Sequence, residues 1–234
     1  MERSKTTTIV TGAGSGIGRE IAHRLLEDGN DVVLVGRTEA TLVETARKAP
    51  ERAMVLPTDF GSADACSEVV RRTIERFGRV DTLVNNAGVA PLEKIHETSE
   101  ETVTNCLAIN LAGPMHLIIA CWPHFMSQRS GCIVNISSVA SIDPFPGFLA
   151  YAASKSGVDS LTRSIIAEGA IFGIRGFTVN PGAVETPMLR SNFNTTFLPE
   201  EHVLPPEAIA NFVVECIKGE HDEKQGRQNP LSKT

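Results

Sequence analysis

The stretch Thr7-Thr8-Ile9-Val10-Thr11-Gly12-Ala13-Gly14-Ser15-Gly16-Ile17-Gly18 decides the fold of this chain. It joins a short β-branched run to an amphipathic segment through four glycines in seven residues. A glycine-rich turn at this place lets the backbone approach a phosphate closely, and the helix that follows presents free N–H groups and the positive end of its dipole. The stretch therefore predicts a strand, a turn and a helix that together bind nucleotide phosphates.

Short apolar runs alternate with amphipathic stretches along most of the remaining chain. Runs such as Val32-Val33-Leu34-Val35 predict strands buried on both faces, as in a parallel sheet between helices. We therefore predict one α/β domain, 1–234, with a single Rossmann-type doubly wound sheet of six strands. The expected strands are 7–11, 31–36, 53–56, 82–85, 132–137 and 174–180, and the expected helices are 17–28, 39–49, 63–77, 99–126, 150–172 and 206–218.

The regular alternation weakens after Pro181. Prolines punctuate 187–206, and the apolar residues there (Met188, Leu189, Phe193, Phe197 and Leu198) indicate a substrate-side lid. The segment 219–234 is polar and has no apolar run, so we expect a flexible tail without regular structure that can be deleted at little cost.

Composition excludes several classes of function. A formal net charge of -6 argues against nucleic acid or an anionic membrane as a partner. The five cysteines and six histidines have no metal-ligand spacing, so no metal is expected. Residues 1–5 lack an apolar signal core and no run reaches about 18 apolar residues, which predicts a cytoplasmic protein outside the membrane.

A second group of residues indicates acid/base chemistry. Ser137 and Ser138 end a predicted buried strand, and Tyr151 and Lys155 share one helical face at i and i+4. Reduction of a carbonyl develops negative charge on its oxygen, so a proton donor must stand beside it. Tyrosine ionises near pH ~10, and bringing its pKa toward neutrality requires about 4 kcal/mol of anion stabilisation, which a nearby ammonium can supply.

These motifs, taken in order, resemble those of the short-chain dehydrogenase/reductase family, which includes 3-oxoacyl-acyl-carrier-protein reductases and short-chain alcohol dehydrogenases. The resemblance covers residues 6 to about 190. The matching motifs are Gly12-x-x-x-Gly16-x-Gly18, Asp59-Phe60, Asn85-Asn86-Ala87-Gly88, Asn110, Ser138 with Tyr151-x-x-x-Lys155, and Pro181-Gly182 with Thr186.

The resemblance implies a catalytic set of Asn110, Ser138, Tyr151 and Lys155. Tyr151 would be the general acid/base, Lys155 would lower its pKa and Ser138 would hold the substrate oxygen, with Ser137 as the local alternative. The implied cofactor-binding residues are Gly12, Ser15, Gly16, Ile17, Arg37, Asp59, Phe60, Asn86, Ala87, Gly88, Tyr151, Lys155, Pro181, Gly182, Val184 and Thr186.

The end of the second strand bears on the choice of cofactor. NAD-preferring sites carry a carboxylate here, whereas this chain has Gly36-Arg37, and an arginine can bind a 2′-phosphate. We therefore expect NADP(H), with NAD(H) possible if Arg37 is merely solvated. The expected activity is hydride transfer between NADP(H) and a small carbonyl or secondary alcohol. The alternatives are an NAD-dependent, hydroxysteroid-like secondary-alcohol dehydrogenase and a non-catalytic NADP(H)-binding module.

Two further expectations concern the long helical region and the carboxyl end. Pro114 has no N–H to donate to the carbonyl of Asn110, which leaves that oxygen free to hold a water beside Lys155, unless the proline only kinks the helix. The family's valine-rich seventh strand has no counterpart in 219–234. This makes the usual tetramer doubtful and favours a homodimer formed through 99–126 and 150–172.

Overall fold

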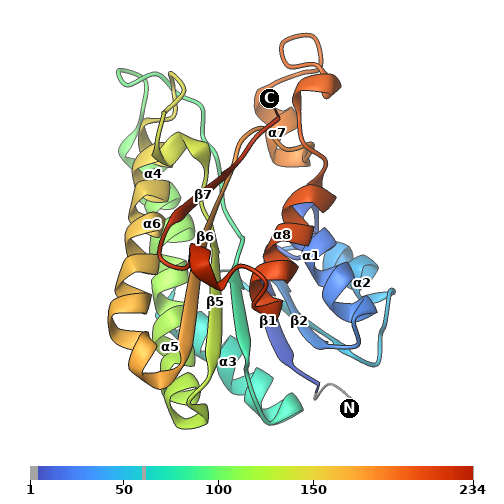
Figure 1. The fold of residues 1–234 in the computed structure, drawn as a ribbon. Coiled ribbons are helices and arrows are strands. Elements are labelled where there is room, and N and C mark those ends of the chain that lie inside the picture. The colour runs from blue at the N-terminus through green and yellow to red at the C-terminus, as the bar shows by residue number, and fades with distance from the viewer. Residues whose placement is uncertain (1–4, 60–61, 234) are drawn as a thin grey trace.

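The computed structural model describes residues 5–59 and 62–233, and a single parallel sheet lies at its centre (Figure 1). Its strand order in the described part of the chain is β3-β2-β1-β4-β5-β6-β7, and all neighbouring strands pair in parallel. The predicted Rossmann-type doubly wound sheet is confirmed, but the predicted number of six strands is wrong. The strands are β1 (Thr7–Thr11), β2 (Asp31–Gly36), β3 (Ala53–Pro57), β4 (Thr82–Asn85), β5 (Gly131–Ile136), β6 (Ile174–Pro181) and β7 (Gln228–Leu231).

Helices cover both faces of the sheet, as the buried strands require (Figure 1). One core joins the sheet to α1, α2 and α8, and a second core on the opposite face joins it to α3, α5 and α6. The helices are α1 (Gly16–Glu27), α2 (Glu39–Ala46), α3 (Ala63–Phe77), α4 (Glu100–Leu107), α5 (Gly113–Gln128), α6 (Leu149–Gly169), α7 (Pro187–Asn192) and α8 (Pro206–Lys218).

The point where the strand order reverses positions the functional site. β1 and β4 are neighbours, although two strands and three helices separate them in the sequence. The crevice beyond the carboxyl ends of two such strands is where doubly wound sheets bind ligands. Here the crevice begins with the glycine turn after Thr11 and with Asn86 after β4.

The carboxyl-terminal segment corrects the expectation of a tail without regular structure. Residues 228–231 form β7, which pairs with β6 at the sheet edge. Polar bonds hold the strand: Asn229 donates from its backbone to Asn180 Oδ1 at 2.9 Å and from Nδ2 to the Thr178 carbonyl at 2.8 Å. Gln228 donates to the buried Asp159 carboxylate at 2.5 Å. Because amide side chains rather than aliphatic ones anchor this strand, the sequence shows no apolar run for it.

Removal of β7 should therefore destabilise the protein. Deleting residues 226–234 breaks the β6 pairing and leaves Asp159 and Asn180 with fewer partners, so we expect the free energy of unfolding to fall by about 3 kcal/mol or more. Urea unfolding followed by circular dichroism measures this. As a control, Lys233→Ala at an exposed site should change stability by less than about 0.5 kcal/mol. Equal stability of the truncated and full chains would contradict a packed tail.

The helical run Glu100–Gln128 is long and apolar enough to cross a membrane by length and composition alone. Its inner face nevertheless packs against the sheet, with Leu117, Cys121 and Phe125 buried in the second core. We therefore interpret the run as a helical segment that covers one face of the sheet and whose outer face is apolar.

Candidate active site

The glycine turn after β1 packs closely against the turn after β4. Gly12 has a φ of +66° and Gly16 a φ of +51°, a region that side chains disfavour. A Cβ at Gly12 would lie 2.7 Å from Asn86 Nδ2 and 3.0 Å from Ala87 Cα. These glycines therefore permit both the backbone conformation and the close approach of the two turns.

Thr11 holds the two turns together. Its hydroxyl accepts the backbone N–H groups of Asn86 and Ala87, each at 2.9 Å, and the Asn86 side chain donates to the Thr11 carbonyl at 2.9 Å. Thr11 was not among the predicted site residues, although its position at the end of β1 was a usable signal. The asparagine of the second turn thus fixes the geometry of the first.

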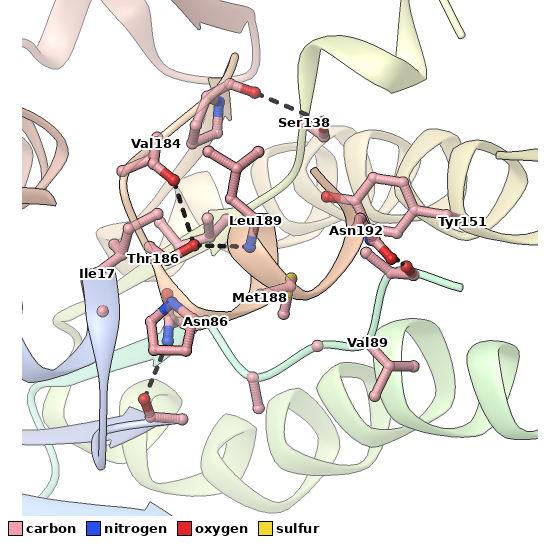
Figure 2. A pocket seen from close by; sticks show the side chains of 18 of the residues that line it. Ile17, Asn86, Val89, Ser138, Tyr151, Val184, Thr186, Met188, Leu189 and Asn192 are labelled. Atoms are coloured by element: carbon pink, nitrogen blue, oxygen red, sulfur yellow. Dashed lines mark hydrogen bonds between the residues drawn. The ribbon is translucent and has the colours of Figure 1, made fainter. Parts of the chain in front are cut away.

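One cavity of about 540 Å³ extends from this turn past the ends of β4, β5 and β6. Figure 2 shows Ile17, Asn86 and Val89 on one part of its wall, the turn from Val184 to Leu189 on another, and Ser138 with Tyr151 beyond. Fifteen of the predicted cofactor-binding residues line it: Gly12, Ser15, Gly16, Ile17, Arg37, Asp59, Asn86, Ala87, Gly88, Tyr151, Lys155, Pro181, Gly182, Val184 and Thr186. Phe60, the remaining one, lies outside the described residues.

The cavity fits an elongated dinucleotide. Ser15 begins α1 without its side chain accepting a bond from the first turn of that helix, so it does not satisfy the backbone N–H groups that face a phosphate. Thr186 packs against the same glycine turn, where a Cβ at Gly16 would lie 2.9 Å from its Cγ2, and it accepts the Leu189 backbone N–H at 3.2 Å. Exposed Arg37 lines the end beyond β2, where no carboxylate follows Gly36.

Ser138 and Tyr151 meet at the carboxyl end of β5. Burial raises the pKa of the Tyr151 hydroxyl, and a hydrogen bond from Ser138 opposes this effect. Ser138 Oγ also accepts the Ala140 backbone N–H at 3.1 Å. Ser137, in contrast, donates its hydroxyl to the Lys155 carbonyl at 3.1 Å. Of the two serines, Ser138 is therefore the one that acts on the pKa of the tyrosine, although its hydroxyl also lies within 3.5 Å of the Pro181 carbonyl (Figure 2).

Lys155 is buried one helical turn after Tyr151. Its Nζ donates to the Ile136 carbonyl at 2.7 Å and lies 5.8 Å from the centroid of the Tyr151 ring. Burial lowers the pKa of Lys155 to about 8, and Cys106 and Asp159 partly offset the burial. The net shift of the Tyr151 pKa in this structure is upward because of burial, so the protein groups alone do not produce the lowered value expected from the sequence.

Asn110 lies behind the cavity rather than on its wall. The side chain is buried and holds Val89, accepting its N–H and donating to its carbonyl, both at 2.8 Å. Residues 108–112 form a π-helical turn in which Gly113 donates to the Ala108 carbonyl, five residues back. The helical register thus changes around Asn110, just before Pro114, as an interrupted bond pattern requires.

Two aromatic residues on the substrate side, Phe145 and Phe148, were not predicted from the sequence. Phe148, just before α6, packs against the Tyr151 ring, and Phe145, Phe193 and Phe197 extend this contact through pairs of phenylalanine rings. Asn192 donates to the Ala90 carbonyl at 2.8 Å and ties α7 to the loop after β4 (Figure 2). Phenylalanines in a proline-containing loop gave no periodic signal that could assign them to the site.

The sequence pattern that defines the short chain dehydrogenases matches residues 6–196. This chain belongs to that family. It is therefore an NAD(P)-dependent dehydrogenase acting on alcohol or carbonyl groups, as predicted.

This short-chain dehydrogenase is similar to proteins from several bacteria. An uncharacterized oxidoreductase of Staphylococcus epidermidis is 34% identical over 209 residues, with 89% of each chain covered. The 2-(R)-hydroxypropyl-CoM dehydrogenase of Xanthobacter autotrophicus is 39% identical over 187 residues, covering 77% of this chain and 75% of the relative. The crystal structure of a 3-ketoacyl-(acyl-carrier-protein) reductase from Brucella melitensis, complexed with NADH, has a TM-score of 0.92 at 27% identity, covering 99% of this chain and 98% of that one.

Proposed function

We propose that this dehydrogenase transfers hydride between NADP(H) and a ketone or secondary alcohol, with Tyr151 as the general acid/base. The observation that carries the proposal is that Tyr151, Ser138 and the glycine turn line one continuous cavity. The bound cofactor would supply or accept the hydride. In the reductive direction, Ser138 would hold the carbonyl oxygen while the Tyr151 hydroxyl donates a proton to it.

Lys155 would supply the positive charge that favours tyrosinate in the working complex. Its ammonium is buried and one helical turn away, where a charge is screened little by solvent. The cationic ring of an oxidised nicotinamide would add to this effect. Burial raises the Tyr151 pKa in the free protein, and we expect this pKa to fall when NADP⁺ binds. An ultraviolet titration of the wild type, with Tyr151→Phe as the reference, measures the pKa. A Tyr151 pKa that is the same with and without NADP⁺ would contradict this role of Lys155.

Arg37 supports NADP(H) as the preferred cofactor. It lines the cavity beyond β2 and forms no ion pair with the side chains described in the structure, so its guanidinium is available to a 2′-phosphate. The NADH bound by the Brucella reductase favours the alternative of an NAD-dependent secondary-alcohol dehydrogenase. A non-catalytic module is disfavoured because Ser138, Tyr151 and Lys155 are all present and adjacent.

A screen of NADPH and NADH binding, followed by turnover of a panel of ketones, tests the proposal. We expect NADPH to bind more tightly and at least one ketone to be reduced, with Tyr151→Phe as the blank. Binding of either cofactor without turnover of any ketone or alcohol would support the non-catalytic alternative.

Asn110 is proposed to link Lys155 to solvent. Pro114 has no N–H to donate to the Asn110 carbonyl. The free carbonyl would hold a water beside Lys155, and this water would return protons from solvent to Tyr151. Pro114→Ala restores a donor that can recapture the carbonyl, so we expect slower turnover with unchanged NADPH affinity. Full activity in this variant, with a regular helix replacing the π turn, would reduce Pro114 to a structural feature.

We further propose a homodimer built on the outer faces of α4, α5 and α6. Leu107, Met115 and Ile119 on α4–α5 are exposed large apolar side chains, which are costly in water and typical of an interface. Sedimentation equilibrium would contradict this if the chain were monomeric at micromolar concentration. Ile119→Glu should weaken self-association, whereas the exposed Glu44→Lys, on α2, should not.

A further inference from the structure

Four phenylalanines from two separate loops form one wall around the proposed catalytic tyrosine. Phe148 lies 5.1 Å from Tyr151 between ring centroids, and Phe193 meets Phe148 and Phe145 edge-on, at 6.2 Å and 5.6 Å. Phe197 stacks on the outer side of Phe193 at 5.4 Å, with 17° between the rings. These residues all line the cavity that Tyr151 lines, so aromatic surface bounds the part of the cavity beside the tyrosine ring.

The loops that carry these rings are anchored, so the wall has a defined shape. Arg190 forms an ion pair with Glu185 and donates to the Leu198 carbonyl at 2.7 Å, which closes the segment around Phe193. Glu185 donates its backbone N–H to Leu204 at 2.9 Å and fixes the base of the same segment. On the other side, Glu93 bonds to the Gly147 carbonyl at 2.9 Å and anchors the loop before Phe148.

Much of this aromatic surface remains uncovered by the protein itself. Phe145 is 47% exposed and Phe197 is 65% exposed. Large apolar side chains gathered at the mouth of a cavity are typical of a ligand-binding wall, because the ligand completes their burial. Aromatic rings also favour edge-on or offset contact with another ring over contact with an alkyl chain of equal area.

The charged residues that line the cavity come from separate elements of the fold. Arg37 and Asp59 follow β2 and β3, and Arg37 also lines a second, shallower pocket with Met188 and Ser191 of α7. Near the wall, the charged residues lining the cavity are Lys155, which is buried against the Ile136 carbonyl, and Asp143. Asp143 lies in the same loop as Phe145 and is exposed. An anionic group beside Phe145 would therefore meet the Asp143 carboxylate, whereas Lys155, the cation beside the tyrosine, is already bonded to the Ile136 carbonyl.

We propose that the substrate is an aryl ketone, or the matching secondary alcohol, that carries no negative charge near the ring, and that Phe193 and Asp143 set this specificity. The inference rests on the proposed reductase function. In the reaction, the carbonyl carbon accepts hydride from NADPH and the oxygen takes a proton from Tyr151. The ketone is reduced to the alcohol, and NADPH is oxidised to NADP⁺.

The test uses acetophenones that differ only in the para substituent, with 2-octanone as the aliphatic comparison. We expect kcat/KM for unsubstituted acetophenone and its para-trimethylammonium derivative to exceed that for the para-carboxylate by about tenfold or more. Phe193→Ala should lower kcat/KM for acetophenone by roughly tenfold while affecting 2-octanone less. Titration calorimetry of acetophenone and its para derivatives with the NADP⁺-loaded enzyme should rank their affinities in the same order as kcat/KM. This readout does not depend on turnover.

Charge reversal separates the effect of Asp143 from that of the ring wall. Asp143→Lys should raise kcat/KM for the para-carboxylate and lower it for the para-trimethylammonium ketone, changing their ratio by about tenfold or more. Glu201→Lys, an equal charge change at an exposed lid position outside the cavity lining, should leave the ratio unchanged.

The outcomes distinguish the two levels of the proposal. If no ketone in the panel oxidises NADPH faster than Tyr151→Phe does, the reductase function fails and this inference fails with it. If the wild type reduces ketones but prefers the carboxylate or 2-octanone, the function stands and the substrate class is wrong. If Asp143→Lys and Glu201→Lys behave alike, Asp143 does not determine specificity.

Discussion

Replacing Tyr151 by Phe is expected to lower kcat for ketone reduction by about a hundredfold or more, with little change in the Kd for NADPH. The substitution removes the hydroxyl that would donate the proton and keeps the ring that packs 5.1 Å from Phe148. Ser138 remains to hold the substrate oxygen but has no proton of suitable acidity to give. Steady-state kinetics and fluorescence titration of NADPH measure the two quantities.

A matched control on the same helix is Ala153→Ser. Ala153 is exposed and lies two residues from Tyr151, so this change should leave both kcat and the Kd near the wild-type values. Wild-type turnover in Tyr151→Phe would remove Tyr151 from the mechanism. A parallel rise in the Kd for NADPH would show instead that the hydroxyl acts chiefly in binding.

The pH profile offers a second readout of the same chemistry. Burial lowers the pKa of Lys155 to about 8 in the free protein, so its ammonium is present below that pH and is lost above it. The Tyr151 pKa is shifted upward, so its proton is retained when Lys155 titrates. We therefore expect kcat/KM for reduction to fall as pH rises through about 8. A profile that is flat from pH 7 to 9 would contradict a required Lys155 charge.

Replacing Arg37 by Asp is expected to shift the ratio of NADPH to NADH affinity toward NADH by about a hundredfold or more. A charge-assisted bond from a guanidinium to a phosphate contributes roughly 1.5–3 kcal/mol, and the introduced carboxylate both repels a 2′-phosphate and accepts bonds from ribose hydroxyls. Arg37 lines the cavity at the end of β2, so the change acts where the 2′-position would lie.

The control for this change is Arg47→Asp. Arg47 is exposed after α2, pairs with Glu44 and does not line the cavity, so the same charge change there should leave the cofactor ratio unaltered. Dissociation constants for both cofactors are measured for the three proteins. Tighter binding of NADH than NADPH by the wild type would show that Arg37 is a solvated residue and that the cofactor proposal is wrong.

Local sequence signals were sufficient to predict the strands, helices and turns that carry the candidate site. The glycine turn, the strand runs and the i, i+4 spacing of Tyr151 and Lys155 each act within a few residues, so the period of a helix or a strand reveals them. Their order along the chain then implies that the carboxyl ends of parallel strands bring Gly12 and Ser138 to one edge. The structure lines one cavity with both.

Contacts between distant segments determined what the sequence could not show. β7 exists because Asn229 and Gln228 find Asn180 and Asp159, residues 49 and 69 positions away, and neither amide leaves an apolar pattern. The aromatic wall likewise joins Phe145 to Phe193 across the cavity. Periodicity reports only whether a side chain faces the core, whereas the identity of its partner depends on how whole elements are placed in space. The sequence by itself therefore determined the family and the sheet apart from β7, and it predicted the reacting groups. The tertiary structure decided the packed carboxyl end, the Lys155 partner and the shape of the substrate side.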